Sequence, residues 1–167
     1  DFQGSTWAPH VVHKSLWFKV GGFSEEFFPG AGSDPDFNMK LWKQGVRIFK
    51  GLANFKVYHF GSVTTRKKYG FKQNRGDKTF LKKWGISIKF FKKYYLQSKT
   101  KYMGPLTEPK ITLNYLFELI LCKIRRYWTT IYLRCFTMNF YIRSINVCYT
   151  FWFILYNLMS IHEDFFL

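Results

Sequence analysis

Residues 21–36 read Gly-Gly-Phe-Ser-Glu-Glu-Phe-Phe-Pro-Gly-Ala-Gly-Ser-Asp-Pro-Asp. The two glycines indicate a turn, a short acidic and aromatic segment follows, and Gly30–Ser33 is typical of a flexible loop. Asp34 is a favoured helix N-cap residue, and Pro35 suits the first helical position because a backbone N–H is not needed there. The stretch therefore predicts a helix from Pro35 to about Gln44 that Gly45 ends.

Two short strands are expected after this helix. Residues 46–49 are Val-Arg-Ile-Phe, and residues 55–60 are Phe-Lys-Val-Tyr-His-Phe with alternating faces. Both runs are rich in β-branched and aromatic side chains, which favour extended structure. The second strand would place His59 near its end.

The positive charge of the chain is concentrated in its middle. The 167 residues carry 26 Lys and Arg against 10 Asp and Glu, and residues 37–101 hold 18 of these cations with one acid, Asp77. Such a block favours an anionic partner: nucleic acid, acidic lipid head groups or a phosphorylated ligand. A solvated basic surface is the alternative. An aromatic content of 22% excludes a polar disordered tail and leaves one domain, with or without an appendage.

Composition divides the chain into four segments. Residues 1–68 mix short apolar runs with Gly and Pro turns, and residues 69–109 are basic and aromatic. Residues 110–127 have the apolar spacing of an amphipathic helix. Residues 128–167 form an apolar tail, in which 144–161 carry no charge over eighteen residues. That length is near the limit for a membrane span, so a spanning helix, an interfacial or buried helix, and an incidental stretch that is no evolved segment all stay open.

Metal and disulfide sites have little support in the sequence. Cys122, Cys135 and Cys148 are widely spaced, with no C-x-x-C pair and no His at ligand spacing. His10 and His13 would share a face only on a helix, whereas Pro9 and two valines favour an extended segment. The pair Asp34 and Asp36 opens a helix after a glycine loop, so we interpret it as helix-capping or acid-base chemistry rather than as a metal-binding Asp-x-Asp.

The order of these features resembles the C-terminal half of family 2 glycosyltransferases with the GT-A fold. The matching features run from Trp7 to Lys68: Trp7, Pro9, the Gly21–Phe27 turn, Ser33–Asp36 at a helix start, Gly45, Val46–Ile48 and Val57–His59. The resemblance implies an α/β fold, in which a partial GT-A-like mixed sheet with a capping helix is followed by a helical basic and apolar C-terminal extension. It further implies that the nucleotide-binding half of the fold precedes Asp1.

The same resemblance implies a reaction and its residues. Asp34 matches the general base, which takes the proton of the acceptor hydroxyl during an inverting transfer from a nucleotide-sugar donor. Gly22, Phe23, Gly32, Ser33 and Asp36 match the acceptor side, and His59 matches a residue that helps bind metal or diphosphate. The divalent metal, Mg²⁺ or Mn²⁺, is expected to be held mainly by the N-terminal half.

Two departures qualify the match. Ser33 stands where many members have Glu, which puts acceptor binding by that residue in doubt. The Gln-x-x-Arg-Trp motif of processive synthases is absent, which favours single additions.

Partners and location follow from the resemblance and the charge. The acceptor is expected to be a glycan or a lipid-linked sugar, and the basic residues would hold a cytoplasmic enzyme at the inner face of an anionic membrane. The alternative is a basic module without catalysis, on a membrane surface or on nucleic acid, with Tyr69, Phe71, Trp84 and Phe90 stacking on bases. No RNA-binding or helix-turn-helix signature supports nucleic acid.

Overall fold

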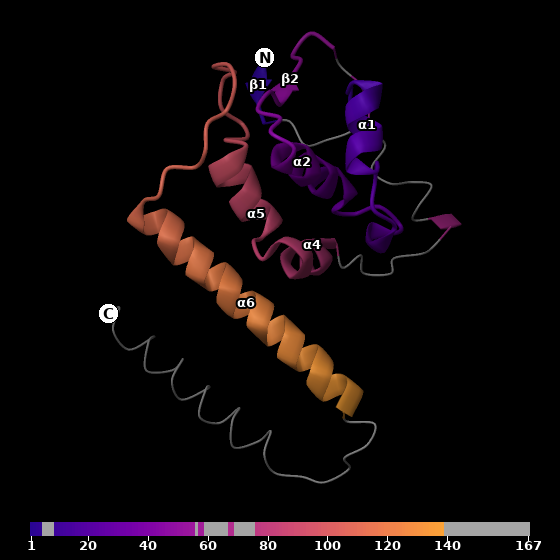
Figure 1. Ribbon diagram of the computed structural model, residues 1–167, viewed down its shortest axis with the longest axis vertical. Helices are drawn as coiled ribbons and strands as arrows, with labels where there is room; N and C mark the ends of the chain where they lie inside the picture. The colour runs from indigo at the N-terminus through magenta and orange to yellow at the C-terminus, as the bar shows by residue number, and fades with distance from the viewer. Residues whose placement is uncertain (5–8, 56, 59–66, 69–75, 139–167) are drawn as a thin grey trace. The chain divides into compact units, whose positions relative to one another are not determined.

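The computed structural model describes residues 1–4, 9–55, 57–58, 67–68 and 76–138, and for 132–138 the backbone only. Contacts divide the chain into a first unit, residues 1–130, and a second unit that begins at Ile131. The described elements are β1 (Phe2–Gln3), α1 (Lys14–Val20), the 3₁₀ turn η1 (Glu25–Phe27), α2 (Ser33–Lys43), β2 (Lys50–Gly51), α4 (Gly76–Trp84), α5 (Ile88–Phe90), the π-helical turn η2 (Phe91–Tyr95) and α6 (Leu113–Met138). Figure 1 labels the helices and strands, and α6 continues past the end of the first unit.

The expected α/β fold is wrong for the part of the chain that the structure describes. That part contains five α-helices and a two-stranded antiparallel sheet, in which Phe2 pairs with Gly51 and Gln3 with Lys50, and it has no mixed sheet. Residues 46–49 precede β2 and are not a strand. Their carbonyls accept isolated bonds instead, from the Leu106 N–H to Arg47 and from the Gly4 N–H to Phe49.

Residues 46–49 do not form the predicted strand because a strand is held by backbone hydrogen bonds to a neighbouring strand. Alternating apolar residues indicate only which face would be buried. Of the second predicted strand, Phe55, Val57 and Tyr58 are exposed and belong to no strand, whereas Lys56, His59 and Phe60 lie outside the described residues.

Helix α2 is the buried centre of the unit. It begins at Ser33, one residue before Asp34, and Gly32 occupies the N-cap position with a φ of +85°. Asp34 is therefore in the first helical turn and is not the N-cap that the sequence predicted. Phe37, Leu41 and Trp42 are buried, and the helix ends at Lys43, just before Gly45.

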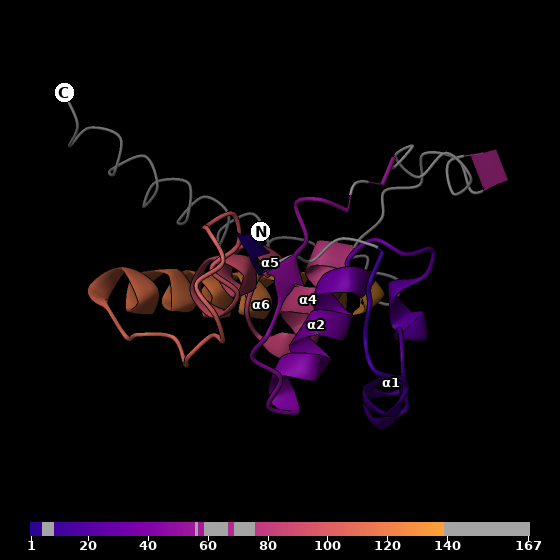
Figure 2. The same ribbon diagram turned by 90° about the horizontal axis from the view of Figure 1, so that it is seen from above.

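The aromatic residues of the basic segment build the core around α2. Phe80 on α4 and the adjacent Phe90 and Phe91 are almost completely buried, and the Trp42 ring meets Tyr95 edge to face with centroids 5.4 Å apart. Figure 2 shows α4 beside α2. Phe90 is only 1% exposed, so it is not accessible for stacking on a base. Tyr69 and Phe71 lie outside the described residues.

The predicted helix over 110–127 is present as α6, which begins at Leu113 and continues to Met138. Tyr115, Leu119 and Cys122 pack against the core of the unit. No helix among the residues that the structure describes has the length and apolar character to cross a membrane. The uncharged run 144–161 is outside those residues, so its three interpretations stay open.

Candidate functional site

Asp34 forms a pair with His10 at the N-terminal end of α2. The Oδ1 atom of Asp34 lies 3.1 Å from Nε2 of His10, and the aspartate side chain is 25% exposed. An ionised carboxylate only accepts hydrogen bonds, so Nε2–H of His10 is the donor when Asp34 is charged. The carboxylate is thus oriented by the protein while part of it stays accessible.

His10 is held by the extended segment before α1. His13 is the N-cap of α1, and its Nδ1 accepts a hydrogen bond from the Ser15 N–H at 3.3 Å. This cap fixes the point where the extended chain ends. The His10 ring also meets Phe37 and Phe23 edge to face, with centroid distances of 5.6 and 6.1 Å. These contacts restrict the imidazole to the side on which Asp34 lies.

Gly22 and Phe23 lie in the turn after α1, beside this pair. The Phe23 ring packs against Trp17 and Phe37 at 5.3 Å from each, yet it remains 44% exposed. A Cβ atom on Gly22 would lie 2.7 Å from the Trp17 ring, and Gly22 has a φ of +56°, so glycine is required there. The turn therefore presents one open aromatic face next to Asp34.

Asp36 has a different environment from Asp34, although two residues separate them. Its side chain is 0% exposed, and it accepts hydrogen bonds from Trp84 Nε1 at 2.7 Å and Ser24 Oγ at 2.7 Å. Lys83 Nζ lies 3.0 Å from the same carboxylate. These partners tie α2 to the loop before η1 and to α4. The acceptor-side role predicted for Asp36 remains a prediction, and its contacts give it a scaffold role.

Two lysines balance the buried carboxylate. Lys40 donates to the Gly22 carbonyl at 3.0 Å and lies 3.9 Å from Asp36, and burial lowers its pKa. Burial also acts to lower the pKa of Lys83, but hydrogen bonds to Glu26 and Asp36 outweigh it, so the pKa of Lys83 is raised. The charge of Asp36 is compensated inside the protein, whereas Asp34 is partly accessible.

Gly32 and Ser33 form the tight entry to α2. A Cβ atom on Gly32 would lie 3.0 Å from the Phe27 ring and 3.1 Å from the backbone of Gly76. The Ser33 hydroxyl donates to the Gly30 carbonyl at 2.6 Å. The loop is thus held against the start of α4, which sets the position of Asp34 one residue later.

A pocket of about 250 Å³ shares His10 and Phe37 with this site. Its lining mixes apolar side chains, such as Leu16 and Phe49, with polar ones, such as Asn38 and Lys50.

The part of the chain that the structure describes contains no cluster of three His, Cys, Asp or Glu residues that could hold a metal. His59 lies outside the described residues, so its predicted role is untested.

Sequence reasoning identified Asp34 but missed His10, which it considered only as a metal ligand together with His13. The separation of 24 residues between His10 and Asp34 leaves no local pattern that would reveal the pair. No protein family model, curated protein or solved structure matches the chain.

Proposed function

We propose that this chain carries the acceptor side of an inverting sugar transferase, with Asp34 as the general base. The observation that supports it best is the contrast between two neighbouring carboxylates. Asp36 is buried and satisfied by three donors, whereas Asp34 is partly open and held by one imidazole. The resemblance of Trp7–Lys68 to family 2 glycosyltransferases supports the same assignment.

In the proposed reaction Asp34 takes the proton of an acceptor hydroxyl as that oxygen attacks the anomeric carbon of a nucleotide sugar. The hydroxyl oxygen forms the new glycosidic bond, the bond to the nucleotide diphosphate breaks, and the configuration inverts. His10 donates to Oδ1, which leaves the other carboxylate oxygen for the acceptor. The exposed Phe23 ring offers an apolar surface for the acceptor sugar.

No described residue is proposed to bind the sugar donor or the metal. The nucleotide-sugar donor and a divalent metal, Mg²⁺ or Mn²⁺, belong to the reaction class, but no step is routed through a metal here. The acceptor is a glycan or a lipid-linked sugar, and the proposed location is the cytoplasmic face of a membrane, which fits the net charge of +16.

The alternative is a basic binding module without catalysis. The positive charge favours it as much as it favours the membrane-side enzyme. For nucleic acid, however, Phe90 is buried, which removes one of the four predicted stacking residues, and the indole N–H of Trp84 is bonded to Asp36.

The test compares Asp34→Asn with Glu108→Gln in the natural polypeptide that contains these 167 residues. Transfer from a panel of nucleotide sugars to glycan and lipid-linked acceptors is followed by nucleoside diphosphate release with Mg²⁺ or Mn²⁺. We expect Asp34→Asn to reduce kcat by roughly 10²–10⁴-fold, the usual contribution of a general base, with acceptor binding retained.

Glu108 is 68% exposed and pairs with Arg47 in the segment before α6, so its substitution also replaces a carboxylate with an amide but outside the site. Unchanged transfer in Asp34→Asn, equal loss in both variants, or no transfer from any donor would overturn the proposal.

A further inference from the structure

Helix α6 has an apolar face that the unit leaves uncovered. Between residues 113 and 127 the helix has two sides, because Tyr115, Leu119 and Cys122 pack on the core. The opposite side carries a row of exposed apolar residues, called here the outer stripe: Leu113, Phe117, Ile120, Ile124 and Tyr127. Their spacing of four, three, four and three residues keeps all five on one side of an α-helix.

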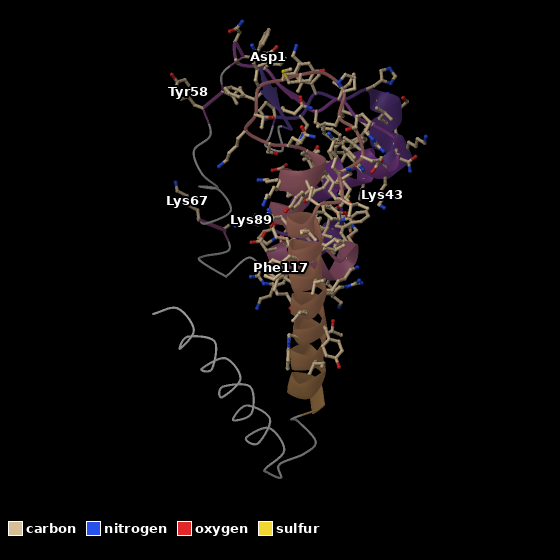
Figure 3. All side chains as sticks on the ribbon, turned by 90° about the vertical axis from the view of Figure 1, so that its left-hand side faces the viewer. Asp1, Lys43, Tyr58, Lys67, Lys89 and Phe117 are labelled. Atoms are coloured by element: carbon tan, nitrogen blue, oxygen red, sulfur yellow. The ribbon has the colours of Figure 1, made fainter. Side chains whose placement is uncertain are left out.

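The outer stripe is too continuous to be scattered surface hydrophobicity. Leu113 is 86% exposed and Phe117 is 63% exposed, and Leu116 and Trp128 extend the stripe at its edges with smaller exposure. Figure 3 labels Phe117 on this helix. Contiguous apolar surface of this kind marks an interaction site in most soluble proteins.

The charges around the outer stripe indicate which partner covers it. Residues 110–130 carry four cations and one acid, Glu118. The terminal nitrogens of Lys123 and Arg126 lie near Gly85, whereas Lys110 and Arg125 are exposed elsewhere on this segment. The Glu118 carboxylate is already paired with Lys93. A positive, aromatic and aliphatic helix face complements an anionic lipid surface, where apolar side chains enter the interface and cations meet head groups.

A second copy of the chain fits this face less well. The spacing would suit a helical pair, but in a parallel pair the exposed Arg125 of each copy would approach the same cation of the other copy. The chain as a whole carries a charge of +16, which adds to this repulsion.

We propose that the outer stripe of α6 is the surface on which this protein docks to an anionic membrane, lying along it rather than crossing it. The inference deepens the membrane-side location in the proposed function and rests on that part of it. The proposal places membrane docking on α6. The sequence had assigned docking to the basic aromatic segment, but the buried aromatic residues of that segment are not available to a membrane.

The test is co-sedimentation of the full chain with vesicles of phosphatidylcholine and phosphatidylserine, with phosphatidylcholine vesicles as reference. We expect binding to the anionic vesicles only, weakened by high salt. Phe117→Glu and Ile120→Glu should each weaken it at least about tenfold, because each removes apolar insertion and adds repulsion. Arg125→Gln should weaken it about fivefold.

Matched controls make the same changes elsewhere on the surface. Met103→Glu adds an acid at a residue that is 86% exposed, and Lys19→Gln removes an exposed cation, so neither should reduce binding comparably. Far-UV circular dichroism checks that each variant keeps its helices.

Equal binding by Phe117→Glu and Met103→Glu, or no vesicle binding by the wild-type chain, would overturn the proposal. So would a dimer in light scattering that Ile120→Glu dissociates, since the stripe would then belong to a second copy. Vesicle binding is measured without donor or acceptor, so its failure and the failure of Asp34→Asn are separate results.

Discussion

The imidazole of His10 donates to the carboxylate of Asp34 across 3.1 Å, although 24 residues separate them in the chain. The pair joins the extended segment before α1 to the first turn of α2. Both side chains are largely buried, and His10 packs against Phe23 and Phe37. This packing favours one orientation of the imidazole toward Asp34. His10 is therefore the residue that positions the proposed base.

A first prediction concerns His10 itself. His10→Phe keeps an aromatic ring against Phe37 but removes the donor to Asp34, so kcat of the proposed transfer should fall at least about tenfold. His10→Gln retains an N–H donor and should recover part of the loss. Steady-state kinetics with a thermal unfolding scan checks this. Equal activity of His10→Phe and wild type would show that the hydrogen bond does not position Asp34.

A second prediction concerns the buried carboxylate of Asp36. Asp36→Ala should lower the free energy of unfolding by about 3–5 kcal/mol, because it leaves Lys83, Ser24 and Trp84 Nε1 without their shared acceptor. Urea denaturation measures this change. The control, Glu25→Ala, removes an exposed acid from the neighbouring turn and should change stability little. A comparable small effect for Asp36→Ala would contradict the scaffold role.

A third prediction concerns the contact between the glycine loop and α4. A Cβ atom on Gly76 would lie 1.9 Å from the Ala31 carbonyl oxygen. Helix propensity alone would make Gly76→Ala stabilising by about 1 kcal/mol, whereas the clash should make it destabilising by about 3 kcal/mol.

Gly45→Ala is the comparison for Gly76→Ala. Gly45 has a φ of +86° but no atom within 4 Å of its added Cβ, so only about 1–2 kcal/mol should be lost there. Chemical denaturation of both variants tests this order. A stabilised Gly76→Ala variant would mean that the loop does not press against α4.

A fourth prediction concerns alkaline pH. Burial opposes the charge of Lys83, yet hydrogen bonds to Glu26 and Asp36 raise its pKa above the ordinary 10.5. The folded protein therefore keeps this proton at a pH where the unfolded chain loses it. The stabilisation by Lys83 should be complete below about pH 10.5 and should be lost as the pH rises through the folded pKa.

The measurement is the difference in unfolding free energy between wild type and Lys83→Met as a function of pH. We expect a constant difference of about 2 kcal/mol up to pH 10 that shrinks above it. Lys43→Met, which removes an exposed lysine at the end of α2, should show no such change. A difference that grows above pH 10.5 would contradict the raised pKa.

The sequence predicted those elements whose cause is local. Apolar spacing located α6, and the Asp-Pro pair with Gly45 located α2 to within two residues at its start. The N-cap was misplaced because Gly32 takes a left-handed conformation that Phe27 and Gly76 impose from outside the helix. The predicted strands were lost because an alternating pattern contains no information about a pairing partner.

By itself, the sequence determined α2 and α6, the basic character of the middle segment and the presence of two carboxylates at one helix start, since these depend on neighbours within a few residues. It did not reveal α1, α4 or α5. Only the tertiary structure decided which carboxylate is buried and which is open. Asp36 is enclosed because Trp84, 48 residues away, reaches it, and Asp34 is paired because His10 packs beneath Phe23 and Phe37. Hydrogen bonds over such separations form only when the apolar core brings distant segments together, so no local pattern encodes them.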